Sequence, residues 1–86
     1  MRLDKYLKVA RILKRRSVSK EMAVNERVYV NGKSAKPAYQ VKVDDIIEVV
    51  FGQKKLTVKV LMIKENARKE DADQMYEILG EEYISA

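Results

Sequence analysis

The residues of this chain that could do chemistry are mainly its cations. Among the first 36 residues, eleven are lysine or arginine and only three are acidic, which gives a net charge of +8. The cations are Arg2, Lys5, Lys8, Arg11, Lys14, Arg15, Arg16, Lys20, Arg27, Lys33 and Lys36. Clustered ammonium and guanidinium groups bind polyanions, above all the phosphate backbone of nucleic acids. The pattern therefore favours nucleic-acid binding over chemistry on a small substrate.

The charge is divided along the chain. Residues 1–64 hold 16 basic and 6 acidic side chains, whereas residues 65–86 hold 2 basic and 7 acidic ones. Physiological salt screens charges beyond about 8 Å, so the two regions act locally and do not average. We therefore predict a basic nucleic-acid-binding domain over residues 1–64 and an acidic C-terminal segment over residues 65–86.

Enzymatic chemistry finds little support in the sequence. The chain of 86 residues has no histidine and no cysteine, so it lacks the commonest general base, a thiol nucleophile and the ligands of a His/Cys metal site. The adjacent carboxylates Asp44 and Asp45 suit a β-turn. We therefore expect no enzyme activity and no cofactor. No apolar run approaches the ~20 residues that span a bilayer, so we also expect no membrane segment and a cytoplasmic location.

Two helices are expected to position the N-terminal cations. Apolar residues recur at helical spacing from Leu3 to Leu13, and the basic residues 14–16 would close this first helix. Ser17 or Ser19 could cap a second helix that runs to Val24. Tyr6 lies in the apolar stripe, which favours a place in the core over base stacking.

Strands follow the second helix. Val28 and Val30 alternate with polar neighbours, and Asn31-Gly32 is a strong hairpin signal. We predict further strands over residues 46–51 and 56–63, paired as a hairpin through a turn at 52–53. A short amphipathic helix is then expected from the spacing of Ala72, Met75, Tyr76, Leu79 and Tyr83, with Gly80 ending it. The fold class is α+β.

Five segments resemble a known family when taken together. They are RLDKYL (2–7), RRSVSKE (15–21), RVYVNGK (27–33), KP (36–37) and V-x-x-D-x-I (41–46). Their order and spacing resemble the ribosomal-protein-S4-like RNA-binding domain, over about residues 1–63. The resemblance implies the alpha-L motif, in which two N-terminal helices pack on a small, mainly antiparallel sheet.

Within that family the chain resembles a small stand-alone bacterial branch that acts in ribosome-associated quality control. This implies binding to the large ribosomal subunit that carries a stalled peptidyl-tRNA, with contacts to rRNA and tRNA and support for alanine tailing by a partner protein. A monomer is expected. The alternatives are a heat-shock-type factor that recycles blocked large subunits and the RNA-targeting module of an RNA-modifying enzyme.

The candidate RNA-binding residues are Arg2, Lys5, Lys14, Arg15, Arg16, Lys20 and Lys33. Arg2 ranks first because a helix dipole disfavours a cation at the helix start, so a structural reason for it is hard to find. Arg16 lies at the helix junction, about 20 Å from Arg2 if one helix joins them. Asp4 either orients Arg2 or is an ordinary first-turn acid. Tyr29 could stack on a base.

Two positions depart from the family pattern. Glu26 and Asp44 stand where the family often has glycine. A residue with a side chain that is forced to positive φ costs on the order of 1 kcal/mol. We therefore expect any difference from the family to lie in these two turns.

Overall fold

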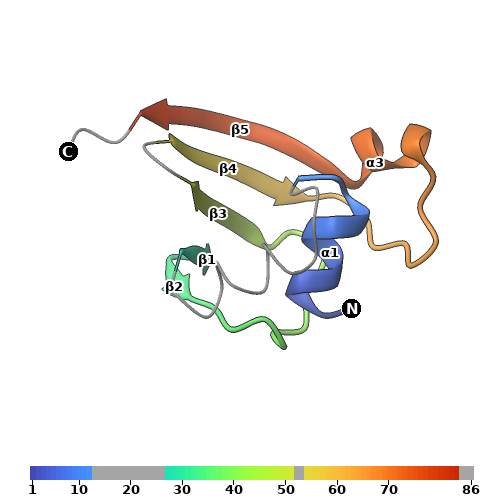
Figure 1. Ribbon diagram of the computed structural model, residues 1–86, viewed down its shortest axis with the longest axis horizontal. Helices are drawn as coiled ribbons and strands as arrows, with labels where there is room; N and C mark the ends of the chain where they lie inside the picture. Colours follow the sequence, from blue (N-terminus) through green and yellow to red (C-terminus); the bar gives the residue numbers. More distant parts are fainter. Residues whose placement is uncertain (13–26, 52–53, 84–86) are drawn as a thin grey trace.

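The computed structural model describes residues 1–12, 27–51 and 54–83. Its elements are α1 (Leu3–Val9), β1 (Val28–Val30), β2 (Lys33–Ser34), β3 (Ile46–Phe51), β4 (Lys54–Val60), α3 (Lys69–Met75) and β5 (Tyr76–Tyr83). The strands form one antiparallel sheet in the order β2-β1-β3-β4-β5. Helix α1 lies over one face of this sheet, and α3 lies where β5 begins (Figure 1). No helix in the described segments is long and apolar enough to cross a membrane.

The apolar stripe of α1 forms one side of the core. Leu3, Tyr6, Leu7 and Ala10 are fully buried, as their helical spacing predicted. The Tyr6 hydroxyl donates a hydrogen bond of 2.8 Å to the Met75 carbonyl oxygen, which ties α1 to the end of α3. Burial raises the pKa of the Tyr6 phenol, so this group stays neutral and remains a donor.

Helix α1 ends sooner than its sequence predicted. Arg11 has a φ of 58°, its N–H donates to the Lys8 carbonyl, and the Ile12 N–H donates to the Leu7 carbonyl. This pair of bonds is the Schellman motif, which closes a helix through a left-handed residue. The prediction that one helix runs from Leu3 to residue 16 is therefore wrong. The predicted Arg2–Arg16 separation loses its basis, and Arg16 itself lies outside the described residues. The predicted second helix lies outside the described residues.

The predicted hairpins are confirmed. Asn31 and Gly32 have φ values of 53° and 83°, as a type I′ turn requires, and Val30 pairs with Lys33 across it. Strand β3 has its predicted bounds and pairs antiparallel with β4. Strand β4 spans Lys54–Val60 instead of residues 56–63, and the turn at 52–53 lies outside the described residues.

The turn before β3 is built around Asp45. Its buried carboxylate accepts hydrogen bonds from Asn31 Nδ2 (3.1 Å), Tyr39 Oη (2.9 Å) and the Lys42 N–H (2.9 Å). Asp44 takes a φ of 75°, the conformation that suits glycine. The turn is thus kept despite the missing glycine, and Asp44 bears the backbone strain. The other departure, Glu26, lies outside the described residues.

The C-terminal segment differs from its prediction beyond Met75. Ala72 and Met75 are buried, and Glu70 and Asp71 occupy the first turn of α3. The chain then becomes extended and pairs with β4 as β5, with Gly80 opposite Thr57. The predicted continuation of this helix from Tyr76 to Gly80 is therefore wrong, and Gly80 lies within a strand instead of ending a helix. The reason is that β4 offers a second row of backbone donors and acceptors, which a strand satisfies and a helix would leave unpaired.

Removing the Asp45 carboxylate should destabilise the fold strongly. Asp45→Ala deletes three hydrogen bonds to a buried charged group, and we expect the free energy of unfolding to fall by about 3 kcal/mol. Urea denaturation followed by circular dichroism measures the change. Asp44→Asn is the matched control, because it removes the same charge from a side chain that is 76% exposed and asparagine tolerates positive φ. An equal loss in both variants would contradict the role given to Asp45.

The start of α3 should be sensitive to pH. Asp71 Oδ2 accepts hydrogen bonds from the Arg68 N–H (3.1 Å) and from Lys64 Nζ (3.0 Å). The backbone bond from Arg68 and then the bond from Lys64 lower the pKa of Asp71 below its ordinary value of 3.8. A group with a lowered pKa stabilises the fold above its ordinary pKa and loses that contribution as the pH falls through the folded-state pKa.

We therefore expect Asp71→Asn to unfold at lower urea concentration than wild type at pH 7. The difference should begin to close as the pH falls below 3.8, where the carboxyl of the unfolded chain is protonated, and it should vanish below the lowered folded-state pKa. Asp73→Asn makes the same charge change at an exposed position of the same helix. A gap that persisted unchanged at pH 3, or one matched by Asp73→Asn at pH 7, would show that these hydrogen bonds do not stabilise α3.

Candidate nucleic-acid interface

Arg2 is held in place by the backbone around it. The Leu3 N–H donates to the Tyr39 carbonyl (2.8 Å), the Val41 N–H donates to the Met1 carbonyl (2.9 Å), and Arg2 forms an isolated β-bridge with Gln40. Arg2 is also the N-cap residue of α1. Backbone contacts with residues 39–41 thus fix the position of Arg2 independently of its side chain.

The Arg2 side chain is oriented by Asp4. Arg2 Nε lies 3.2 Å from Asp4 Oδ1 and Nη2 lies 3.3 Å from Oδ2, so two N–H groups meet the two carboxylate oxygens. The Asp4 side chain is 1% exposed and that of Arg2 is 44% exposed. These two bonds use two of the five guanidinium N–H groups, and the exposed part of the group can still bind a phosphate. The geometry thus supports the orienting role of Asp4, which also serves as a first-turn acid because its Oδ1 accepts the Lys5 N–H at 2.8 Å.

Lys5 lies one residue beyond this pair and is partly exposed. Its Nζ is 3.9 Å from Glu65 Oε1, and the Lys5 side chain is 37% exposed. At this distance the ion pair is weak and solvated. Lys5 is therefore a surface cation that can exchange its carboxylate neighbour for a phosphate.

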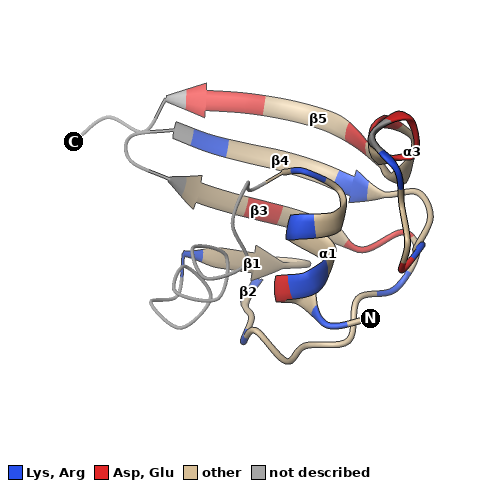
Figure 2. Ribbon diagram, turned by 45° about the vertical axis from the view of Figure 1, so that its right-hand side comes forward, with Lys and Arg blue, Asp and Glu red and all other residues tan. Residues whose placement is uncertain are grey.

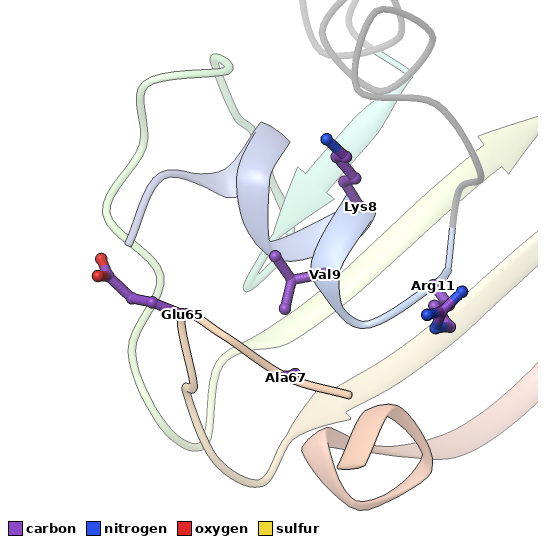
Figure 3. A pocket seen from close by; sticks show the side chains of 5 residues that line it. All are labelled: Lys8, Val9, Arg11, Glu65 and Ala67. Carbon is purple, nitrogen blue, oxygen red and sulfur yellow. The ribbon is translucent and has the colours of Figure 1, made fainter. Parts of the chain in front are cut away.

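Two cations outside the candidate set border a groove at the end of α1. The groove has a volume of about 550 Å³. It is lined by Lys8, Val9, Arg11, Glu65 and Ala67 (Figure 3). Both cations are exposed. The same signal that selected Lys5, a cation off the apolar stripe of the helix, also marks these two residues. The left-handed backbone of Arg11 could not be seen in the sequence pattern, because its neighbours predicted a continuing helix.

Lys33 is the first residue of β2 and follows the β1–β2 turn. It is exposed and pairs with Val30, which is buried in the core. Residues directly opposite each other in an antiparallel pair project from the same face, so Lys33 leaves the sheet on the face that packs against α1. Figure 2 shows blue segments on α1 and around the hairpin, and red ones on α3 and β5.

Three of the seven candidate residues are thus described, namely Arg2 and Lys5 at the start of α1 and Lys33 on the hairpin. The other four, Lys14, Arg15, Arg16 and Lys20, lie outside the described residues. Tyr6 is fully buried, so it cannot stack on a base. Tyr29 is half-buried and pairs with Glu48, which places it on the face opposite to α1.

Known proteins match the chain over most of its length. Residues 1–47 match the S4 domain family. The chain is 57% identical over 81 residues to the "RQC P-site tRNA stabilizing factor" of Streptococcus pneumoniae, with 94% of this chain and 92% of that protein covered. It is 50% identical over 84 residues to the Bacillus subtilis protein of the same name, with 98% of each covered.

A second group of similar proteins carries another name. The chain is 34% identical over 82 residues to "Heat shock protein 15" of Escherichia coli, and it covers 62% of that protein. The solved structure of trimeric Vibrio cholerae Heat Shock Protein 15 superposes with a TM-score of 0.84 at 33% identity, over 91% of this chain and 80% of that one.

Substitutions at Arg2 should separate charge from geometry. We expect Arg2→Ala to weaken binding to folded ribosomal RNA and to lower the slope of log K against log salt concentration by about 1. Arg2→Lys should keep the slope but still bind more weakly, because an ammonium group cannot form two parallel bonds to a phosphate. Fluorescence anisotropy across a salt series measures both quantities, and thermal unfolding of each variant shows whether the α1 start remains folded.

Lys59→Ala is the matched control for these variants. Its side chain is 39% exposed, and its register opposite Ile46 and Glu77 places it on the sheet face away from α1. The salt slope of this variant should equal that of the wild type. If Lys59→Ala lowered the slope as much as Arg2→Ala did, binding would be spread over the whole surface and not directed to α1.

Proposed function

Because the chain belongs to the S4 domain family, we propose that it is an RNA-binding factor of ribosome-associated quality control. In this proposal it acts in the cytoplasm as a monomer without catalytic activity. It binds the large ribosomal subunit that holds a stalled peptidyl-tRNA, and it contacts both rRNA and tRNA. It thereby holds the tRNA in the P site while a partner protein extends the stalled chain with C-terminal alanines.

The observation that carries the proposal is the similarity over nearly the whole chain to proteins named as P-site tRNA stabilizing factors. Identities of 50% and 57% extend over more than 90% of both chains in each comparison. The similarity therefore includes the acidic segment as well as the basic domain. A shared RNA-binding domain alone would match only the first part of the chain.

The geometry of the cations fits folded RNA better than duplex DNA. Helix α1 has seven residues, about 10 Å at 1.5 Å per residue, which is too short to serve as a recognition helix along a major groove. Its exposed cations instead suit the backbone and shape of structured RNA. Arg2 and Lys5 on α1 and Lys33 on the hairpin form one side of the proposed interface, and Lys14, Arg15, Arg16 and Lys20 are proposed to extend it.

A recycling factor for blocked large subunits is the second candidate. It is supported by the similarity to the heat shock proteins in sequence and in fold. Both candidates bind RNA through the same domain, so the basic surface does not separate them. Identity favours the first, since it is 57% with the Streptococcus pneumoniae factor and 50% with the Bacillus subtilis factor, against 34% with the Escherichia coli heat shock protein.

Binding to purified large subunits tests the proposal. We expect the affinity for subunits that hold a peptidyl-tRNA in the P site to exceed that for empty subunits by at least about ten-fold, or 1.4 kcal/mol, because only the former offer both RNA surfaces. Co-sedimentation at fixed salt measures the two affinities. Equal affinities would overturn the proposal that the protein stabilises P-site tRNA.

The matching control uses free components. Peptidyl-tRNA alone and large-subunit rRNA alone should each bind more weakly than the complete complex, since each provides one of the two contacts. Addition of the protein should also slow the release of peptidyl-tRNA from the subunit. Faster release on addition would support the recycling alternative instead.

A further inference from the structure

The outermost strand of the sheet on the C-terminal side has an open edge. The strand order places β5 last, beside β4, and no other strand within residues 1–12, 27–51 and 54–83 pairs with it. Strand β5 has eight residues, so it presents a long row of backbone N–H and C=O groups. Such an edge is a template for pairing with another extended chain.

The middle of β5 exposes two adjacent apolar side chains. Ile78 is 52% exposed and Leu79 is 50% exposed. Leu79 has no partner on β4, because the register shifts between Thr57 and Val58. Ile78 lies opposite the buried Val58 and so continues the apolar face of the sheet to its margin. A strand added beyond β5 would cover this margin.

Exposed acids lie on either side of the apolar pair. Glu77 and Glu82 are exposed and stand in register with Lys59 and Lys55 of β4. Those lysines already have other partners, since Lys55 Nζ lies 2.9 Å from Glu48 Oε2 and Lys59 Nζ lies 3.8 Å from Asp44 Oδ1. Each of these two lysines is thus shared between two acids, and Glu77 and Glu82 remain exposed.

This charge pattern selects among the molecules that could pair with the edge. Nucleic acid is repelled by the carboxylates. A second copy of the chain, paired antiparallel about the middle of β5, would place Glu77 of each copy opposite Glu82 of the other, and like charges directly opposite are destabilising. An extended basic segment with alternating apolar residues would be attracted by the carboxylates, and it would place no glutamate opposite Glu77 or Glu82.

We propose that the open edge of β5 binds an extended, basic segment of a partner protein as a sixth strand of the sheet. Backbone hydrogen bonds to β5 provide the pairing, Ile78 and Leu79 provide apolar contact, and Glu77 and Glu82 select lysine or arginine. This surface lies at the sheet edge opposite to β2. A protein could therefore be bound there while the basic side of the molecule holds RNA.

The first experiment uses a synthetic peptide of eight alternating lysine and valine residues with the full-length protein. We expect saturable binding by fluorescence anisotropy, and we expect slower hydrogen exchange of amides within Tyr76–Tyr83. A peptide that alternates glutamate and valine should not bind. Backbone N-methylation of the basic peptide at alternate residues should abolish binding, because it removes the donors that pair with β5. Equal binding by the acidic or N-methylated peptide would overturn the proposal.

Variants with matched controls locate the site. Ile78→Lys should weaken binding of the basic peptide by about ten-fold or more, whereas Val43→Lys should leave it unchanged. Both residues are 52% exposed in the wild type, and both substitutions add the same charge. Glu77→Lys and Glu70→Lys form a second pair, since both acids are exposed but Glu70 lies on α3. This pair keeps the test valid if Ile78→Lys unfolds, which thermal denaturation shows.

Two further outcomes decide against the proposal. Equal weakening by the β5 variants and by their controls would mean that the peptide binds through net charge alone. Self-association of the wild type that Ile78→Lys abolishes, measured by sedimentation equilibrium, would mean that the edge serves a second copy of this chain.

Discussion

The packing of α1 against the sheet is the constraint on which the rest of this structure depends. A helix of seven residues is far too short to persist alone in water. Burial of Leu3, Tyr6 and Leu7 supplies about 1.5–3 kcal/mol for each side chain. The Tyr6 hydroxyl adds a hydrogen bond to Met75, 69 residues further along the chain. The cations at the start of α1, Arg2 and Lys5, thus have fixed positions only because the C-terminal part of the chain packs against this helix.

The same helix shows how a binding surface can compete with stability. Arg2 places a positive charge at the end of α1 where the helix dipole is itself positive. Asp4, in the first turn, offsets this charge and fixes the direction of the guanidinium. A cation that the helix would otherwise disfavour is therefore kept, half-exposed and oriented, at the surface. An acid placed for the helix alone would need no bidentate contact with its neighbour.

The turns and strands could be predicted from the sequence where no contact distant in sequence competes with the local preference. The Asn31-Gly32 turn, the alternation of Val28 with Val30, and the bounds of β3 follow from local backbone and burial preferences, and they are confirmed. The end of α1 could not be predicted in this way, because the left-handed position that glycine usually fills is occupied by Arg11. The sequence lacks the glycine that would have predicted the end of the helix, although the hydrogen bonds that end it are present.

Strand β5 was mispredicted for a different reason. The spacing of Ala72, Met75, Tyr76 and Leu79 fits a helix, and its first part does form one. Whether the chain continues as a helix or as a strand after Met75 depends on β4. The free edge of β4 is more than a dozen residues away in sequence, so a local pattern cannot predict the pairing.

Among the candidate RNA-binding residues, the exposure of Lys5 and Lys33 follows from their positions off the apolar pattern. The Arg2–Asp4 contact could not be predicted, because the spacing of the two residues is compatible with both roles of Asp4.

The order of the strands explains how one small sheet carries charge of both signs. Strand β2, with Lys33, and strand β5, with Glu77 and Glu82, form opposite edges of the sheet. Four strand spacings of about 4.8 Å separate the edges by roughly 19 Å, more than twice the screening length of about 8 Å at physiological salt. The acidic edge therefore lies beyond the screening length from Lys33. The sheet order, which the net charge of +5 does not reveal, thus keeps the acidic edge apart from the hairpin that carries Lys33.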